Sequence, residues 1–253
     1  MKPLYLDGRA PLRVRLEGPA LRVGGTPHAD GRYPLRRLSR VIVSGSVEWR
    51  TSALLACLAR GVPITFLDQH GAPVGYCFGA TALEMPLAER LRELLDRPDW
   101  AERYRLWHTA EQRRAILRAL RAAHRRVDDL RPDTVRAVLE AGHQRYLARA
   151  RVRRIHAALQ GMLAALCTQI LLEAGLQPEL IGQRRRGLDL TQDLTALLEW
   201  PLHRVTRGLA KARATSGSRQ AVTAAFESAA PDLARRGHAH LSRLEAWLAE
   251  LWP

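Results

Sequence analysis

The chain has 253 residues, 47% of them hydrophobic, which is enough to bury the core of one large or two small domains. Its 40 Lys and Arg residues outnumber 25 Asp and Glu residues, giving a formal net charge of +15. No apolar run approaches the ~20 residues needed to span a bilayer, and the first residues lack a signal-peptide pattern. These features argue against an integral membrane protein, and we expect a soluble, cytoplasmic globular protein.

The positive charge is almost entirely arginine, because Lys2 and Lys211 are the only lysines. Guanidinium groups stay charged at physiological pH and bind phosphate through paired hydrogen bonds. A basic excess of this size favours a polyanionic partner, above all nucleic acid. The alternative is that a GC-rich genome encodes arginine wherever a surface cation is tolerated.

Residues 1–80 contain short alternating or β-branched runs separated by Gly and Pro, a pattern typical of strands and turns. Strands are predicted at residues 12–16, 20–23, 38–43, 62–67 and 74–78. Leucines at helical spacing within residues 49–60 predict one helix, ended by Gly61. We therefore expect a small, β-sandwich-like N-terminal domain over residues 1–80.

From residue 81 onward, long Leu-, Ala- and Arg-rich stretches with a period of 3.6 residues predict a larger all-α domain over residues 81–253. Helices are predicted from Pro86, over 100–126, from Pro132 to 151 or beyond, over 162–174, and from 189, with two closing helices after 218. Pro201 is expected to kink or restart its helix, and residues 212–218 to form a turn. The segment 162–174 is apolar on every side and should be the central buried helix. The predicted fold class is α+β.

Two blocks of sequence resemble a known family. The first is Arg32-Tyr-Pro-Leu-Arg-Arg-Leu-Ser-Arg-Val-Ile-Val-Ser-Gly45, followed by residues 54–71 with Gly-Val-Pro-Ile-Thr-Phe-Leu and by Val74-Gly75. The second is Leu171-Leu-Glu-Ala-Gly-Leu-Gln-Pro178, followed by Ile181-Gly182 and by Gly187-Leu-Asp-Leu-Thr-Gln-Asp-Leu194. In this order they are similar to the CRISPR-associated integrase family of spacer acquisition.

The resemblance implies a β domain that forms a homodimer and a helical domain that binds DNA. It also implies two dimers flanking a small ferredoxin-like acquisition partner. The implied activity is that of a metal-dependent DNA integrase and endonuclease, which inserts short double-stranded fragments into a CRISPR array. In such a reaction a 3′-hydroxyl attacks a phosphodiester, and a divalent cation such as Mg²⁺ or Mn²⁺ neutralises charge on the phosphate.

The family holds its metal with a Glu, a His and an Asp, and the resemblance assigns these places to Glu140, Gln183 and Asp193. Gln183 stands where the family has histidine, and its amide cannot take up a proton as imidazole can. Ala196 stands where the family often has a second carboxylate, and Asp189 is a further oxygen ligand or a helix N-cap. Glu140 has an alternative role as a surface partner of Arg136, one helical turn away.

A histidine from another part of the chain could take the place of Gln183 at the proposed metal site. His143, three residues after Glu140, is the best candidate, and His156 and His203 are further candidates. Arg184, Arg185 and Arg186 form a run beside the proposed metal site, where bound phosphate would relieve their mutual repulsion. A solvated loop is the alternative explanation of such a run. Arg153 and Arg154, with their neighbours Arg149 and Arg151, could extend the same basic surface.

Three functional hypotheses follow from the sequence. The first is the metal-dependent integrase, with catalytic positions Glu140, Gln183 and Asp193. The second is a catalytically impaired protein of the same fold that serves as a DNA-binding scaffold. The third, an unrelated Arg-rich helical module that binds nucleic acid, leaves the ordered N-terminal resemblance unexplained.

Overall fold

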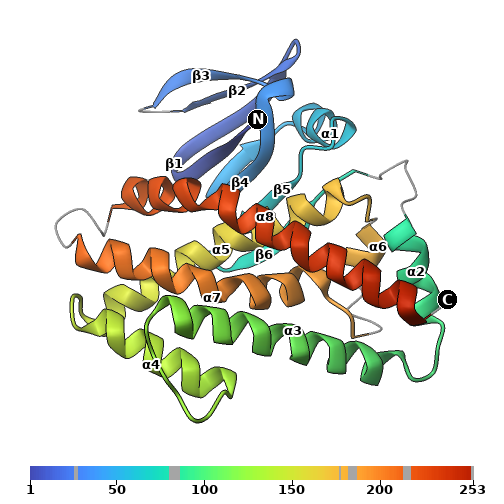
Figure 1. The fold of residues 1–253 in the computed structure, drawn as a ribbon. Helices are drawn as coiled ribbons and strands as arrows, with labels where there is room; N and C mark the ends of the chain where they lie inside the picture. Colours follow the sequence, from blue (N-terminus) through green and yellow to red (C-terminus); the bar gives the residue numbers. More distant parts are fainter. Residues whose placement is uncertain (26–27, 80–85, 177, 182–186, 213–217, 252–253) are drawn as a thin grey trace.

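The computed structural model describes residues 1–25, 28–79, 86–176, 178–181, 187–212 and 218–251. Figure 1 shows a β-sheet with one helix at one end of the molecule and a bundle of long helices below it. The predicted α+β class, with strands first and helices after, is confirmed. The expected domain boundary between residues 80 and 81 lies outside the described residues, so the division at that point stays a prediction.

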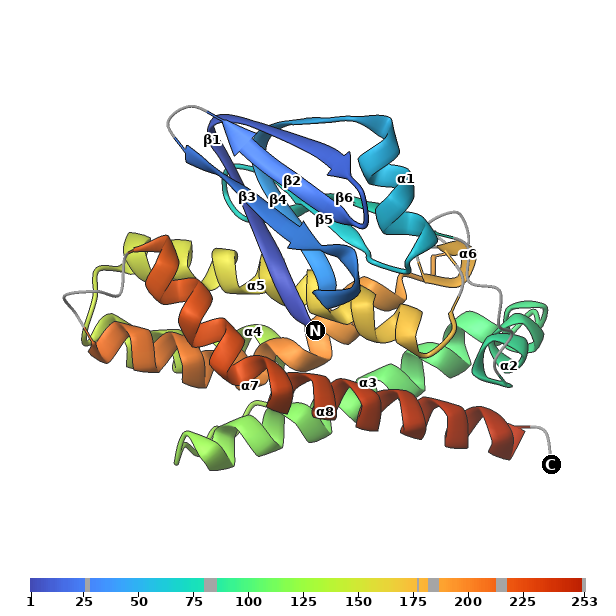
Figure 2. The ribbon, with the colours of Figure 1, turned by 90° about the horizontal axis from the view of Figure 1, so that it is seen from above.

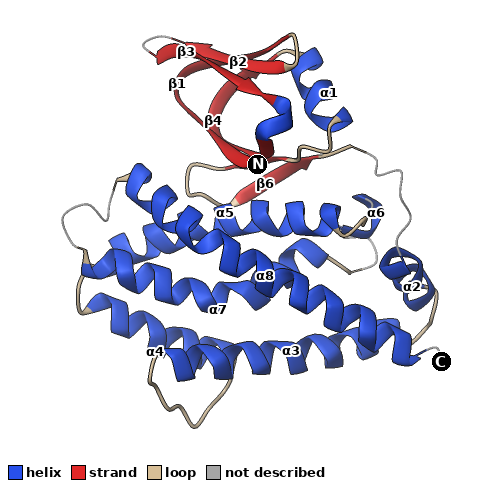
Figure 3. Ribbon diagram, turned by 45° about the horizontal axis from the view of Figure 1, so that its top comes forward, coloured by secondary structure: helices blue, strands red, loops and turns tan. Residues whose placement is uncertain are grey.

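The N-terminal strands form one mixed six-stranded sheet with the order β3-β2-β1-β4-β5-β6. Strand β1 pairs with β4 in parallel, β4 pairs with β5 in parallel, and the other neighbours are antiparallel. A register shift in the β1–β4 pairing between Gly8 and Leu12 accompanies the bend of the sheet visible in Figure 3. The strands are β1 (Lys2–Glu17), β2 (Ala20–Gly25), β3 (His28–Pro34), β4 (Leu38–Trp49), β5 (Ile64–Leu67) and β6 (Pro73–Cys77).

Helix α1 (Thr51–Ala59) connects the parallel strands β4 and β5, as a parallel pair requires. It closes the inner face of the sheet, where Ala53 and Cys57 are buried with Val14 and Val43 in one cluster. The five predicted strands and the predicted helix are therefore confirmed, with β1 beginning ten residues earlier than its alternating pattern indicated.

The C-terminal part is helical throughout its described length, apart from the connections. Figure 2 shows the sheet lying over α5, with α7, α8, α3 and α4 packed beyond it. The helices are α2 (Pro86–Leu95), α3 (Trp100–Ala122), α4 (Pro132–Gln144), α5 (Arg149–Glu173), α6 (Pro178–Ile181), α7 (Leu190–Lys211) and α8 (Arg219–Leu251).

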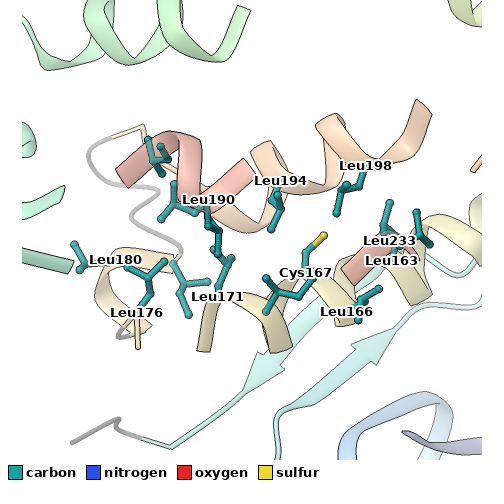
Figure 4. Packing of buried hydrophobic residues seen from close by; sticks show 14 of the residues in the cluster. Leu163, Leu166, Cys167, Leu171, Leu176, Leu180, Leu190, Leu194, Leu198 and Leu233 are labelled. Atoms are coloured by element: carbon teal, nitrogen blue, oxygen red, sulfur yellow. The ribbon is translucent and has the colours of Figure 1, made fainter. Parts of the chain in front are cut away.

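Helix α5 is the central element of the bundle, as the uniformly apolar sequence predicts. Figure 4 shows Leu163, Leu166 and Cys167 of α5 packed against Leu194 and Leu198 of α7. Burying one such leucine contributes about 1.5–3 kcal/mol, so this seam holds the bundle together. By length and composition α5 could also cross a membrane, but 67% of its most apolar window is buried inside the protein, as expected of a core helix.

Several helix boundaries differ from the sequence-based expectation. The helix from Pro132 ends at Gln144, and a new helix begins at Arg149 rather than continuing through residue 151. After residue 218 there is one helix of 33 residues, which passes through Pro231. Helix α7 also continues through Pro201, so it does not restart there, and the alternative of a kink stays a prediction. Proline costs a helix about 3 kcal/mol, and the buried leucines of α7 and α8 offset that cost. Of the expected turn at 212–218, residues 213–217 lie outside the described residues.

A buried polar network joins the sheet to the bundle. Arg40 of β4, 4% exposed, donates to Glu227 of α8 at 2.9 Å and to Gln169 of α5 at 3.0 Å. The Tyr5 hydroxyl of β1 also donates to Glu227. At Gly161 the helix approaches the β5–β6 turn so closely that a Cβ would lie 1.9 Å from the carbonyl oxygen of Gly71. These contacts fix the sheet against α5 and α8.

Candidate active site on helices α3 and α7

Asp193 lies in the first turn of α7, half-buried against α3. The Tyr104 hydroxyl donates to its Oδ2 at 2.9 Å, and Nε2 of His108 lies 3.4 Å from its carbonyl oxygen. One turn earlier, Asp189 is the N-cap of α7, and its Oδ1 accepts from the backbone N–H of Gln192 at 2.9 Å. The predicted N-cap role of Asp189 is therefore confirmed. These residues form an acidic corner, defined as Asp189, Asp193, Tyr104 and His108.

The negative charges of the acidic corner favour the binding of a cation. Burial raises the pKa of Asp193, and the negative charge of Asp189 raises it further, against the opposing effects of His108 and Tyr104. Burial also raises the pKa of Tyr104 well above its usual value, so its hydroxyl remains a donor. The Asp193 carboxylate is thus partly desolvated, and no Arg or Lys among the described side chains forms an ion pair with it.

Glu140 does not lie close to Asp193 in the folded chain. Helix α4 packs on α7 through the ion pair Arg136–Glu199 at 2.7 Å and through the rings of His143 and His203, whose centroids lie 5.4 Å apart. Glu140 lies between those two contacts, opposite residues 199–203 of α7. Because a helix rises about 1.5 Å per residue, that level is about 9–15 Å from Asp193 along the axis. Arg136 has Glu199 and Asp133 as its acidic partners, so the alternative Glu140–Arg136 pair does not form in the described chain.

The acidic corner offers a divalent cation only two carboxylates, those of Asp189 and Asp193. The described residues contain no group of three His, Cys, Asp or Glu side chains that could hold a metal ion. Mg²⁺, however, commonly takes one or two carboxylates and completes its shell with water and substrate phosphates. Asp193, with Asp189 one turn away, matches that donor set, whereas Glu140 does not contribute. The proposed ligand Gln183 and the arginines Arg184, Arg185 and Arg186 lie outside the described residues.

His143, expected as a substitute ligand, belongs to a different cluster. It is 3% exposed and stacks on His203, which in turn stacks on His156 with ring centroids 4.9 Å apart. Burial lowers the pKa of His203 to about 2 and that of His156 to about 4, so both imidazoles are neutral at physiological pH. The cluster lies about 15 Å along α7 from Asp193, at the level of Glu140.

Arg153 and Arg154 are exposed on the first half of α5. Neither has an ion-pair partner within the described ranges, so both side chains are available to an external anion. Sequence reasoning missed Tyr104, His108 and the buried carboxylate Glu111. A Tyr and a His four residues apart on an amphipathic helix were the available signal, but nothing local placed that face against Asp193.

The acidic corner leads to a stability prediction. Asp193→Asn keeps an acceptor for Tyr104 but removes a desolvated charge, so we expect the variant to match or exceed the wild type in thermal stability at pH 7–8, by up to about 3 °C. Because the folded-state pKa of Asp193 is raised, its charge destabilises the protein above the unfolded-state pKa, and the penalty disappears as pH falls below it. The difference in melting temperature should therefore shrink towards pH 3.5. A variant less stable than wild type at pH 8 would contradict this account.

Comparison with known proteins agrees with the sequence resemblance. The family model described as CRISPR associated protein Cas1 matches residues 8–159, and a search of the curated proteins finds no match. A solved CAS1 protein from Thermotoga maritima is 14% identical, with a TM-score of 0.81 over 98% of this chain and 97% of that one. A casposase bound to integration product is 12% identical, with a TM-score of 0.66 over 97% and 91%. The TtCas1–DNA complex is 15% identical, with a TM-score of 0.59 over 100% and 91%.

At these identities the solved structures establish a shared fold over nearly the whole chain. The family match covers more than half of the chain and includes most of the sheet, α3, α4 and the start of α5. The protein therefore belongs to the Cas1 family of CRISPR-associated proteins.

Proposed function

We propose that this protein is a DNA integrase of spacer acquisition, which joins the 3′-hydroxyl ends of short duplexes to a CRISPR repeat. The observation that carries the proposal is the desolvated Asp193 carboxylate at the N-terminus of α7, in a chain of the Cas1 family. Support also comes from the net charge of +15 and from the exposed Arg153 and Arg154. The titles of two structural neighbours name an integration product and DNA, which fits the same chemistry.

The chain's own residues would contribute positioning and charge. Asp193, with Asp189, would hold Mg²⁺ or Mn²⁺ together with DNA phosphate oxygens. A bound divalent cation supplies charge neutralisation at the attacked phosphodiester. Tyr104 holds Asp193 through its 2.9 Å hydrogen bond, and Asp189 keeps the first turn of α7 in place through its cap. Arginines on the surface would hold the duplex by its phosphates without reading its sequence.

The proposal is tested by strand transfer with the purified protein. Labelled short duplexes with free 3′-hydroxyls are incubated with a supercoiled plasmid that carries a CRISPR repeat. Joined product is expected with Mg²⁺ or Mn²⁺ and not with a chelator. The small acquisition partner is added in a parallel reaction, since the resemblance implies a complex of two homodimers with such a partner in the cytoplasm. Absence of product under all these conditions would contradict the proposal.

The second candidate is a DNA-binding scaffold of the same fold without catalysis. The observation that favours it is the separation of Glu140 from Asp193, together with Ala196 and Gln183 at positions where the family has ligands. A scaffold binds DNA equally well with and without chelator and forms no product. The strand-transfer assay and a binding isotherm on the same preparation therefore distinguish the two candidates.

The basic face of α5 gives a prediction for DNA binding. Replacing both Arg153 and Arg154 by glutamine removes two exposed guanidinium groups. If each contacts one phosphate, the slope of log K against log salt concentration should fall in magnitude by about 2. The matched control is Arg36→Gln/Arg37→Gln in the 3₁₀ turn before β4, which removes the same charge from another surface. Equal slopes for the two double variants, measured by fluorescence anisotropy, would show that α5 makes no specific phosphate contacts.

A further inference from the structure

A cavity of about 830 Å³ lies between α3, α4, α7 and α8, away from the acidic corner. Its lining includes Trp200 and His203 of α7 and His143 of α4, but not Asp189, Asp193 or Glu140. Pockets of roughly 300–1,000 Å³ are typical of sites for small organic ligands. The cavity is therefore large enough for a ligand well beyond the size of a simple anion, and it is distinct from the site proposed for strand transfer.

The floor of the cavity, defined here as the lining residues Trp200, His143 and His203, carries buried ring nitrogens without hydrogen-bond partners among the described residues. Trp200, His143 and His203 are 1%, 3% and 4% exposed. The indole Nε1 of Trp200, Nδ1 of His143 and both ring nitrogens of His203 have no hydrogen-bond partner among the described residues. Buried polar atoms are normally satisfied, since leaving one unpaired costs about 1–3 kcal/mol. A ligand with several hydrogen-bonding atoms would satisfy them.

The rim of the cavity is strongly basic. Its arginines are Arg118 and Arg121 of α3, Arg125 in the connection that follows α3, Arg204 and Arg207 of α7, and Arg236 of α8. The one carboxylate in the lining is Asp232, which is paired with Arg235 and Arg236. The other five rim arginines have no ion-pair partner in the part of the chain that the structure describes. Guanidinium groups gathered without counter-charges favour an anion, and phosphate matches their paired donors.

The walls between floor and rim are mainly apolar, with Ala119, Leu139 and Val205 among the lining residues. A flat, apolar ring with polar edges fits such walls and offers acceptors to the unpartnered donors of the floor. At physiological pH the histidines of the floor are neutral, so they present N–H and lone-pair sites rather than charge.

We propose that this cavity binds a nucleotide unit, with the base on the floor and apolar walls and the phosphate at the arginine rim. The unit is either a free mononucleotide or the phosphorylated terminal unit of a DNA strand, because both present the same base, sugar and phosphate. The site is separate from the acidic corner, and binding is measured without strand transfer, so failure of one proposal leaves the other standing.

The test is isothermal titration calorimetry on the full-length protein with dAMP, deoxyadenosine, inorganic phosphate and a 5′-phosphorylated oligonucleotide. We expect dAMP to bind at least tenfold more tightly than either deoxyadenosine or phosphate. Arg204→Gln/Arg207→Gln should weaken dAMP binding at least tenfold. The matched control Arg36→Gln/Arg37→Gln, with the same loss of charge outside the cavity, should bind dAMP within twofold of wild type.

A second variant tests the floor. His203→Phe keeps a ring of similar size but removes two unpartnered nitrogens, so we expect equal or higher thermal stability of the free protein and dAMP binding weakened at least fivefold. If the oligonucleotide binds through Arg204 and Arg207 while dAMP does not bind, the occupant is a strand end, which supports the site. Equal affinity for phosphate and dAMP, equal effects of the two double arginine variants, or no binding of either nucleotide probe would overturn the proposal.

Discussion

Glu111→Ala should lower the free energy of unfolding by about 1–3 kcal/mol, because it removes the shared acceptor of the buried His240 ring and the partly exposed Arg243 and Arg114 guanidiniums. Glu111 of α3 is fully buried and accepts from Nε of Arg243 at 2.9 Å, lies 2.8 Å from Nδ1 of His240, and pairs with Arg114. Burial alone raises the pKa of Glu111, but the hydrogen bonds from His240 and Arg243 outweigh it and hold the pKa at about 2.

The same carboxylate predicts a pH dependence. Since its folded-state pKa is lowered, Glu111 stabilises the protein above its unfolded-state pKa of about 4.5, and this stabilisation is lost as pH falls towards 2. Urea unfolding at pH 7 and pH 3 measures both effects, with Arg113→Ala as the control on the exposed side of the same helix. A loss below 1 kcal/mol for Glu111→Ala at pH 7 would mean that water or another group replaces the carboxylate.

Arg40→Met should destabilise the protein by about 2–3 kcal/mol, because Glu227, a partly buried carboxylate between sheet and bundle, loses its charged partner and keeps only the hydrogen bond from Tyr5. The guanidinium of Arg40 joins β4 to Glu227 and Gln169 and also lies 6.0 Å from the ring of Phe226. Methionine keeps most of the aliphatic volume, so the measured loss reports on the polar contacts rather than on a cavity.

A double-mutant cycle with Glu227→Gln isolates this pair. If the ion pair dominates, Arg40→Met/Glu227→Gln should lose less stability than the sum of the single variants, with a coupling energy of about 1–3 kcal/mol. Arg37→Met, an exposed change three residues earlier, should stay within about 0.5 kcal/mol of wild type. Additive single effects in urea unfolding would show that Arg40 and Glu227 act independently.

Local patterns predicted most of the fold. The alternating residues 12–16 lie in β1, because alternation predicts a strand with one buried face. The apolar run 162–174 lies in α5, because a helix that is apolar on every side is predicted to be buried on every side. The end of α4 and the continuity of α8 were mispredicted. The break before Arg149 has no Gly or Pro to mark it, and Pro231 is tolerated within packing that only the folded structure defines.

The candidate site was less predictable because its contacts join distant parts of the chain. Asp193 meets Tyr104 across 89 positions, and Glu111 meets His240 across 129. In the sequence, Glu111 looks like any exposed helix carboxylate. Glu140 was assigned by resemblance alone, and the packing of α4 on α7 places it beside the histidine cluster instead.

We propose that the reaction centre lies at the acidic corner. A series of carboxylate variants in the strand-transfer assay tests this assignment most directly. Initial rates of product formation are compared for wild type, Asp193→Asn and Glu140→Gln at saturating Mg²⁺, with DNA binding measured for each protein. We predict a loss of at least about 100-fold for Asp193→Asn, in line with the removal of a group that stabilises transition-state charge, and a change below threefold for Glu140→Gln. Unchanged activity in Asp193→Asn, or a loss confined to Glu140→Gln, would contradict the assignment of the acidic corner as the reaction centre.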